Sequence, residues 1–211
     1  MPTWDELFSN EEFIWQNPHE KVVELARLLK DRKKMHILDL GSGAGRHLVY
    51  LAKEGFRVDG MDFSTRGLAY AREWLAREGV GATLTRADMT ALPYEDNYFD
   101  ALISIHVIFH NTLALLRQTL SEIYRILRPG GLALLTFQST RSYRFGRGIQ
   151  LEPGTFIPDI GGDAGVPHHF MDLVEIGREL DQFCVRNVNL YENYNEGSEK
   201  SSHWEVIAEK E

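Results

Sequence analysis

The sequence has almost no cysteine, because Cys184 is the only one among its 211 residues. No disulfide can form within the chain, and no cysteine-based zinc site can be built. Proteins of reducing compartments typically have such a composition. We therefore expect a cytoplasmic protein.

Long apolar runs are also lacking. The longest, residues 101–109, is interrupted by Ser104 and His106 and is far shorter than the roughly 20 residues of a membrane helix. The first residues, MPTWDELFSNEEF, are acidic and lack the basic and apolar regions of a signal peptide. The sequence therefore predicts no membrane partner.

Positive charge is scarce, since 23 lysines and arginines face 31 acidic residues and give a formal net charge of -8. Sites for nucleic acids are usually basic, and only Arg141, Arg144 and Arg147 form a local basic cluster here. We expect no nucleic-acid partner. The expected partner is a small-molecule substrate, and the expected assembly is a monomer or a homodimer.

A metal site is not predicted either. The sequence contains no H-E-x-x-H pattern. His168 and His169 are adjacent, and adjacent residues in an extended segment point to opposite sides, so the pair would chelate one ion poorly. One of the two is expected to face the substrate.

The first two thirds of the chain alternate between short apolar runs and amphipathic segments. Strands are expected at 35–40, 56–62, 82–88, 98–106 and 131–139, and helices at 19–30 and 45–55. Ser64 is expected to cap a third helix, whose apolar face includes Leu68, Ala71 and Leu75. A fourth helix is defined by Leu116, Leu120, Ile123 and Leu127 and is expected to stop at Pro129, Gly130 and Gly131. This order predicts an α/β fold with a doubly wound parallel sheet. After a helix near 171–182, the runs 184–194 and 201–210 are joined by a short polar turn and predict a C-terminal antiparallel hairpin.

We interpret residues 1–211 as one domain. Trp4, Phe8, Phe13 and Trp15 either line the mouth of a pocket as part of an N-terminal helical cover over residues 1–34 or pack as a helix on the sheet. Residues 143–170 are rich in glycine and proline and have no clear period. They are expected to be an irregular connection that acts as a substrate lid.

The stretch ILDLGSGAGRH, residues 37–47, has the character of a ligand-binding loop. Gly41, Gly43 and Gly45 follow an expected strand and open a helix, as in nucleotide-binding α/β proteins. The loop alone fits a nicotinamide dinucleotide, a flavin or S-adenosylmethionine. Arg46 occupies the position of the third glycine of the dinucleotide pattern, and Asp39 would repel a pyrophosphate but attract an amino group.

Two further carboxylates follow the next strands. Asp62 ends the second strand, where an acid can accept both ribose hydroxyls, and Asp88 follows the third strand, within reach of an adenine amine. Three acids around one loop favour a ligand with cationic groups over one with phosphates. The neighbouring residues therefore favour S-adenosylmethionine.

From about residue 37 to 138 the chain resembles the class I S-adenosylmethionine-dependent methyltransferases. The resemblance rests on ILDLGSGAG, VDGMDFS, RADMTALPYEDNYFDALIS and ILRPGG in this order. It implies a Rossmann-like, seven-stranded, mostly parallel sheet of order 3-2-1-4-5-7-6.

The resemblance also implies a set of cofactor-binding residues. The methionine portion of the cofactor would lie along the glycine loop, the ribose on Asp62, and the adenine on Phe63 with Asp88 and Met89 at its edge. Ile105 and His106 would border the transferred methyl group, and His47 would either contact the cofactor or cover it. The whole set is Asp39, Gly41, Ser42, Gly43, Gly45, His47, Asp62, Phe63, Asp88, Met89, Ile105 and His106.

His106 and His110 are the candidate catalytic residues. Either could accept a proton from the acceptor, because histidine titrates near neutral pH, or both could only shape the pocket. The sequence thus predicts a methyltransferase that moves a methyl group by in-line displacement to a small molecule. The alternatives are an NAD(P)-dependent oxidoreductase and a non-catalytic protein that binds adenosylmethionine.

Overall fold

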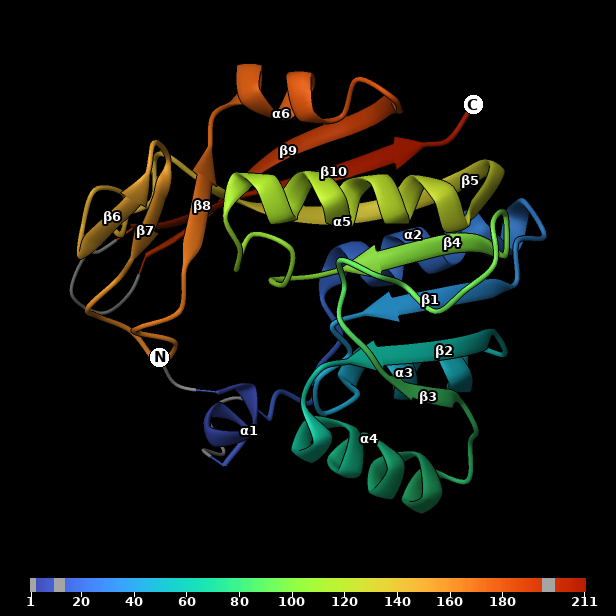
Figure 1. Ribbon diagram of the computed structural model, residues 1–211. Coiled ribbons are helices and arrows are strands. Elements are labelled where there is room, and N and C mark those ends of the chain that lie inside the picture. The colour runs from blue at the N-terminus through green and yellow to red at the C-terminus, as the bar shows by residue number, and fades with distance from the viewer. Residues whose placement is uncertain (1–2, 10–13, 195–199) are drawn as a thin grey trace.

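A computed structural model describes residues 3–9, 14–194 and 200–211 (Figure 1). Five parallel strands form the centre of its sheet in the order β3-β2-β1-β4-β5. Their bounds are β1 (His36–Leu40), β2 (Arg57–Asp62), β3 (Thr83–Arg86), β4 (Phe99–Ser104) and β5 (Leu127–Ser139). The predicted parallel sheet is confirmed.

Helices cover both faces of this sheet. On one face lie α2 (Glu20–Asp31), α3 (Arg46–Lys53) and α4 (Thr65–Glu78), whose apolar sides form one buried cluster with the sheet. On the other face lie α5 (Leu113–Ile126) and α6 (Leu173–Glu179), which contribute to a second cluster. The two clusters are the hydrophobic core, and burying apolar side chains on both faces of the sheet stabilises the fold.

The C-terminal hairpin closes the sheet as predicted. Strand β10 (Lys200–Glu209) pairs antiparallel with both β5 and β9 (Cys184–Tyr194), which gives the order β3-β2-β1-β4-β5-β10-β9. Val206 packs in one core cluster and Ile207 packs against the other, because successive residues of a strand point to opposite faces. This order is the predicted 3-2-1-4-5-7-6.

The segment 143–170 differs from its prediction. It is not an irregular connection, because it contains β6 (Ile149–Glu152), β7 (Thr155–Ile157) and the start of β8 (His168–Met171). Strands β6 and β7 form a hairpin, β7 pairs antiparallel with β8, and β8 continues parallel to the end of β5. These strands are too short, and β8 too uniformly buried, to show an alternating pattern in the sequence.

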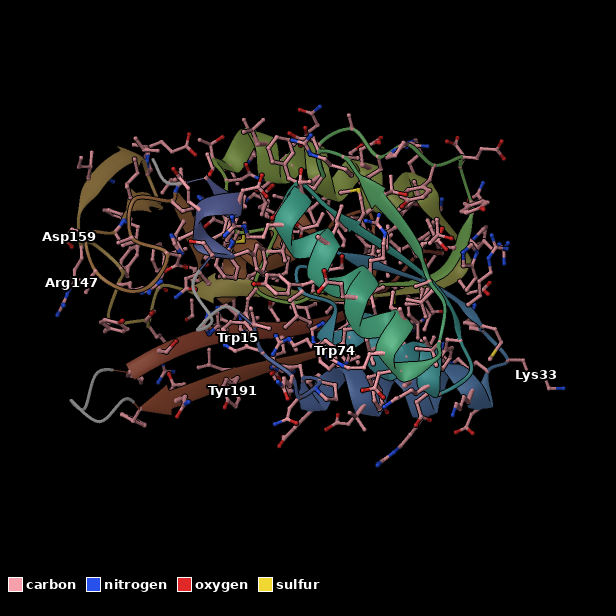
Figure 2. All side chains as sticks on the ribbon, turned by 90° about the horizontal axis from the view of Figure 1, so that it is seen from below. Trp15, Lys33, Trp74, Arg147, Asp159 and Tyr191 are labelled. Atoms are coloured by element: carbon pink, nitrogen blue, oxygen red, sulfur yellow. The ribbon has the colours of Figure 1, made fainter. Side chains whose placement is uncertain are left out.

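Strands β6, β7 and β8 form an addition to the seven-stranded sheet, the β6–β8 addition. It lies beyond the carboxyl ends of the central strands. The arrows of β1, β2 and β4 all point toward it and toward the short helix α1 (Trp4–Leu7) (Figure 1). In the view from below, Arg147 and Asp159 mark this end of the molecule and Lys33 marks the opposite end (Figure 2). Ligands of open α/β sheets bind at the carboxyl ends of strands, so the addition and α1 flank the expected site.

Helix α5 ends at Ile126, before the predicted stop at Pro129, Gly130 and Gly131. Leu127 already pairs with Phe99, and the register then shifts where Gly130 has a φ of 72°. The glycine turn thus lies inside β5 rather than between a helix and a strand. Within the described residues, no helix has the length and apolar character needed to cross a membrane.

Candidate active site

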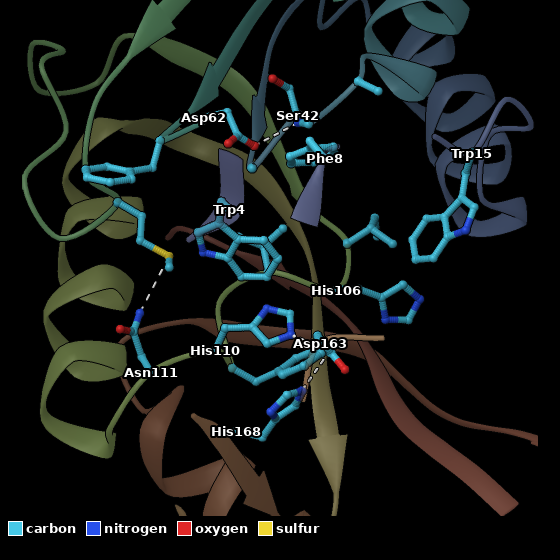
Figure 3. Close-up of a pocket in the computed structure, with 18 of the residues that line it drawn as sticks. Trp4, Phe8, Trp15, Ser42, Asp62, His106, His110, Asn111, Asp163 and His168 are labelled. Carbon is cyan, nitrogen blue, oxygen red and sulfur yellow. Dashed lines mark hydrogen bonds and ion pairs between the residues drawn. The ribbon is translucent and has the colours of Figure 1, made fainter. Parts of the chain in front are cut away.

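A cavity of about 680 Å³ opens at the carboxyl ends of the central strands (Figure 3). One half is formed by the loops after β1, β2 and β3. The other half is formed by the loop after β4, the end of β5, the segment 143–168 and the start of β10. Residues of the N-terminal segment lie over both halves.

The glycine loop forms the floor of the first half. The backbone N–H groups of Gly41 and Ser42 donate to the carbonyl oxygen of Met61, at 2.7 and 3.0 Å, which fixes the loop against β2. Gly41 has a φ of 76°, and a Cβ added to it would lie 2.3 Å from Val107 Cγ2. Both the left-handed backbone and the close approach require glycine at this position.

Asp62 joins the glycine loop to α4. Its Oδ2 accepts from the backbone N–H of Gly43 at 2.8 Å, and its Oδ1 accepts from that of Ser64 at 2.8 Å (Figure 3). Burial raises the pKa of Asp62, although the amides of Ser64 and Gly43 act to lower it. A carboxylate has about four acceptor sites, so this group can accept two more hydrogen bonds from ligand hydroxyls.

Three buried polar atoms next to the loop have no hydrogen-bond partner among the described residues: Asp39 Oδ2, Ser42 Oγ and His47 Nε2. His47 Nδ1 lies 3.8 Å from Asp39 Oδ1, which leaves Nε2 free. Buried polar groups are nearly always paired, so these atoms indicate a polar ligand. A carboxylate, a hydroxyl and an imidazole fit the ammonium and carboxylate of a methionine moiety.

The loops after β2 and β3 provide a flat, open wall. The Phe63 side chain is 56% exposed, and the Arg86 guanidinium lies 5.3 Å from its ring centre. Asp88 Oδ1 accepts from the backbone and side chain of Thr90, at 2.8 and 2.7 Å, which orients the carboxyl group and leaves Oδ2 available. An exposed aromatic ring beside an oriented carboxylate fits a planar base carrying an amino group.

His106 marks the border between the two halves. It has a φ of 60°, unusual for a residue other than glycine, and its backbone N–H donates to Thr136 Oγ1 at 2.6 Å. Its ring centre lies 4.5 Å from that of His203. Burial, with the neighbouring His203 and Arg46, holds the pKa of His106 well below its usual value, so the ring is neutral at pH 7.

A cluster of charged and imidazole groups forms the far end of the cavity. Asp163 lies between His110 and His168, with its Oδ2 3.4 Å from His110 Nε2 and 3.0 Å from His168 Nε2 (Figure 3). Arg144 Nη1 donates to Asp163 Oδ1 at 2.7 Å. Burial opposes ionisation, but the contacts with His110 and His168 hold the pKa of Asp163 below its usual range. Burial lowers the pKa of His110 to about 4.

Aromatic residues of the N-terminal segment form the roof. The Trp4 ring lies 5.0 Å from that of His110, and the Trp15 ring lies 6.3 Å from that of His106 (Figure 3). Phe8 lies over the glycine loop, where a Cβ on Gly43 would come within 2.8 Å of its ring. Trp4, Phe8 and Trp15 thus take the pocket-lining alternative, while Phe13 lies outside the described residues.

The structure brings nearly all of the predicted residues to the cavity wall. Those that line it are Gly41, Ser42, Gly43, Gly45, His47, Asp62, Phe63, Asp88, Met89, Ile105, His106 and His110. Asp39 differs, because it is buried behind the wall, with its Oδ1 3.8 Å from His47 Nδ1. Its attraction of an amino group, directly or through water, stays a prediction.

Sequence reasoning found part of the far end, because residues 143–170 were expected to act as a substrate lid and His168 of the predicted histidine pair lines the cavity. The individual residues Arg144, Asp163, Ser201 and His203 were not predicted as site residues. The antiparallel direction of β10 carried a usable signal, because such a strand begins where its parallel neighbours end. Arg144 and Asp163 gave no signal, since they come together only through the folding of the 143–170 segment.

Comparison with known proteins agrees with this geometry. A family profile described as a methyltransferase domain matches residues 37–131. The chain is 35% identical over 139 residues to a demethylmenaquinone methyltransferase of Thermus thermophilus, covering 64% of this chain and 62% of that protein. It is 30% identical over 158 residues to an uncharacterised methyltransferase of Synechocystis sp., covering 74% of this chain and 69% of that protein.

A solved structure described as that of an S-adenosylmethionine-dependent methyltransferase from Methanosarcina mazei has the same fold. It superposes with a TM-score of 0.73 at 20% identity, covering 84% of this chain and 92% of that one. The chain spans less than two thirds of the length of the first curated relatives that it matches, 62% and 42% for the first two.

Proposed function

The chain belongs to the class I S-adenosylmethionine-dependent methyltransferases, and we propose that it transfers the methyl group of this cofactor to a small-molecule acceptor. The observation that carries the proposal is the single cavity with two chemically different halves. The glycine-loop half has unpaired polar atoms that fit the cofactor. The far half is lined by imidazoles and aromatic rings that fit a second, smaller reactant.

We propose that the predicted cofactor residues hold S-adenosylmethionine as their positions suggest. Asp62 would bind the ribose hydroxyls, Phe63 would stack on the adenine, and Asp88 with Met89 would lie at its edge. Ser42 and His47 would bind the methionine moiety. Asp39 lies next to Nδ1 of His47, so Nε2 of that ring would be left free for the ligand. The cofactor supplies an electrophilic methyl group on a sulfonium centre.

The residues of the chain then have three tasks. Ile105 and His106 at the border hold the acceptor in line with the methyl group, which lowers the entropic part of the barrier. Trp4, Phe8 and the 143–170 segment exclude water. Where the acceptor carries a proton, the neutral rings of His106 and His110 are the groups placed to accept it.

A small-molecule acceptor is supported by the cavity volume of about 680 Å³, which is typical of small-molecule sites, and the Thermus relative is named for a quinone, demethylmenaquinone. The formal charge of -8 disfavours a nucleic-acid acceptor. The single Cys184 fits a reducing compartment, so we place the reaction in the cytoplasm.

Two measurements test the proposal. Calorimetry with S-adenosylhomocysteine and with NADH should show binding of the former alone. Incubation with S-adenosylmethionine carrying a radiolabelled methyl group and a pool of small metabolites should label a compound of the pool. Tight binding of NADH without binding of adenosylhomocysteine would contradict the cofactor assignment, and binding without any labelling would indicate a non-catalytic protein.

A further inference from the structure

We propose that His110, Asp163 and His168 form a binding site for a divalent transition-metal ion at the acceptor end of the cavity. Its role in methyl transfer rests on the function proposed above, but the binding itself does not. The three residues come from separate parts of the chain: the loop after β4, the turn before β8, and the first residue of β8. Sequence spacing could not reveal this set.

The distances within the cluster are those of metal ligands. One donor atom from each residue lies within 4.8 Å of the other two, and Asp163 Oδ2 lies 3.4 Å from His110 Nε2 and 3.0 Å from His168 Nε2. Donors about 2.1 Å from one ion, at angles between octahedral and tetrahedral, lie roughly 3.0–3.4 Å apart. The two distances from Asp163 Oδ2 therefore match those between ligands of one ion.

His110 provides an independent indication. Its side chain is only 5% exposed, yet neither ring nitrogen has a hydrogen-bond partner among the described residues. Its Nε2 lies 3.4 Å from Asp163 Oδ2, and burying an imidazole that is so weakly paired is unfavourable unless a ligand completes its contacts.

His168 provides a third observation. Its Nδ1 lies 2.9 Å from the carbonyl oxygen of Val166, which can only accept, so Nδ1 carries the ring hydrogen. The other nitrogen, Nε2, faces the carboxylate oxygen of Asp163 at 3.0 Å, so the nitrogen that is not held by the backbone points into the cluster. A carbonyl that holds the other nitrogen is also the usual support of a metal-binding histidine.

Arg144 is the competing cation. Its Nη1 donates to Asp163 Oδ1 at 2.7 Å and lies 3.4 Å from His168 Nε2. By holding Oδ1 it turns Oδ2 toward the two histidines, as a supporting group does in metal sites. It does not reach the unpartnered His110, so the guanidinium leaves part of the cluster unsatisfied.

The ligand set indicates the kind of ion. Two imidazoles and one carboxylate suit Zn²⁺, Co²⁺, Ni²⁺ or Fe²⁺ better than Mg²⁺ or Ca²⁺, which prefer oxygen ligands alone. All three residues line the cavity, so further coordination positions face the acceptor. A hydroxyl or thiol acceptor held there would have a lowered pKa.

Methyl transfer at this site needs only the acceptor and the cofactor. The acceptor O–H or S–H bond breaks, and its proton passes to His106, because His110 uses its lone pair on the ion. The acceptor atom then bonds to the methyl carbon. The carbon–sulfur bond of the cofactor breaks, and its electron pair stays on the sulfur of S-adenosylhomocysteine.

The full chain, first treated with a chelator, is titrated with Co²⁺ and with Zn²⁺, with Mg²⁺ as a comparison. We expect one Co²⁺ per chain with a visible absorption band, displaced by Zn²⁺, and no binding of Mg²⁺. The variants His110→Ala and Asp163→Asn should each lose at least about tenfold in affinity. The matched control His19→Asn removes a histidine that does not line the cavity and should bind as the unaltered chain does.

Circular dichroism and the affinity for adenosylhomocysteine show whether each variant folds. Equal Co²⁺ binding by all variants would indicate adventitious binding at other histidines and overturn the proposal, as would no binding at all. Binding of the metal without any binding of adenosylhomocysteine would instead contradict the proposed function and leave the metal site intact.

Discussion

At the scale of single residues, Asp62 connects the cofactor half of the cavity to the sheet. Its two oxygens hold the amides of Gly43 and Ser64, one in the glycine loop and one at the start of α4. The position of this acid at the end of the second strand could be predicted, because an acid there follows from the strand–loop–helix pattern. Its two structural hydrogen bonds could not, because they depend on how closely the glycine loop approaches β2.

We expect Asp62→Ala to weaken the binding of adenosylhomocysteine by about 1–3 kcal/mol, because charge-assisted hydrogen bonds to the ribose are lost. Isothermal titration calorimetry measures this change. Asp59→Ala is a matched control, since Asp59 lies on the same strand, is equally buried and pairs with His36 away from the cavity. An unchanged affinity of the Asp62 variant would show that the ribose assignment is wrong.

At the scale of elements, the side chain of Asp5 connects helix α1 to the start of α4. Asp5 Oδ1 accepts from Ser64 Oγ at 2.7 Å and from the backbone N–H of Arg66 at 2.9 Å. Both donors belong to the first turn of α4, next to Asp62. Trp4 and Phe8 lie on either side of Asp5 in the chain and line the cavity, so we expect this contact to help hold them over it.

We expect Asp5→Ala to release α1 and to increase the dissociation rate of adenosylhomocysteine. The loss of two exposed hydrogen bonds, each of about 1 kcal/mol, corresponds to an increase of roughly five- to thirtyfold. Stopped-flow fluorescence can follow this rate through Trp4. Asp31→Ala, at the far end of α2, is the control, and a rate equal to that of the unaltered chain would show that α1 does not retain the cofactor.

The same scale shows which parts of the fold the sequence could predict. The central strands are long, apolar and separated by amphipathic helices, so periodicity identifies them. The hairpin of β9 and β10 was found because its side chains alternate. Strands β6 and β7 have four and three residues, and their pairing depends on each other and on β8. Local patterns do not record such contacts, so the strands within the predicted substrate lid, and with them the positions of Arg144 and Asp163, could not be predicted.

At the scale of the whole molecule, histidines with lowered pKa values gather in and next to the cavity. Burial lowers the pKa of His19 to about 4 and that of His203 to about 3, and it also lowers the pKa of His47 and His106. In the unfolded chain these groups have the ordinary value near 6.5. Between these values the unfolded state binds more protons than the folded state, so falling pH favours unfolding.

We therefore expect the free energy of unfolding to be constant above about pH 6.5 and to fall as the pH is lowered toward 4, before most carboxylates of the unfolded chain titrate. Urea denaturation at a series of pH values measures the slope. His203→Gln should reduce it by up to about 1.4 kcal/mol per pH unit, because one proton fewer is taken up. A flat profile between pH 7 and 5 would show that these histidines are already protonated in the folded state.

The position of the β6–β8 addition has a consequence for protein engineering. The family profile ends at residue 131, whereas the cavity residues of the far half, apart from the loop after β4, lie between Gln138 and His203. The β6–β8 segment begins and ends next to β5 and carries residues of the far half of the cavity. We expect that exchanging this segment for that of another methyltransferase would change the acceptor and leave the methyl donor the same.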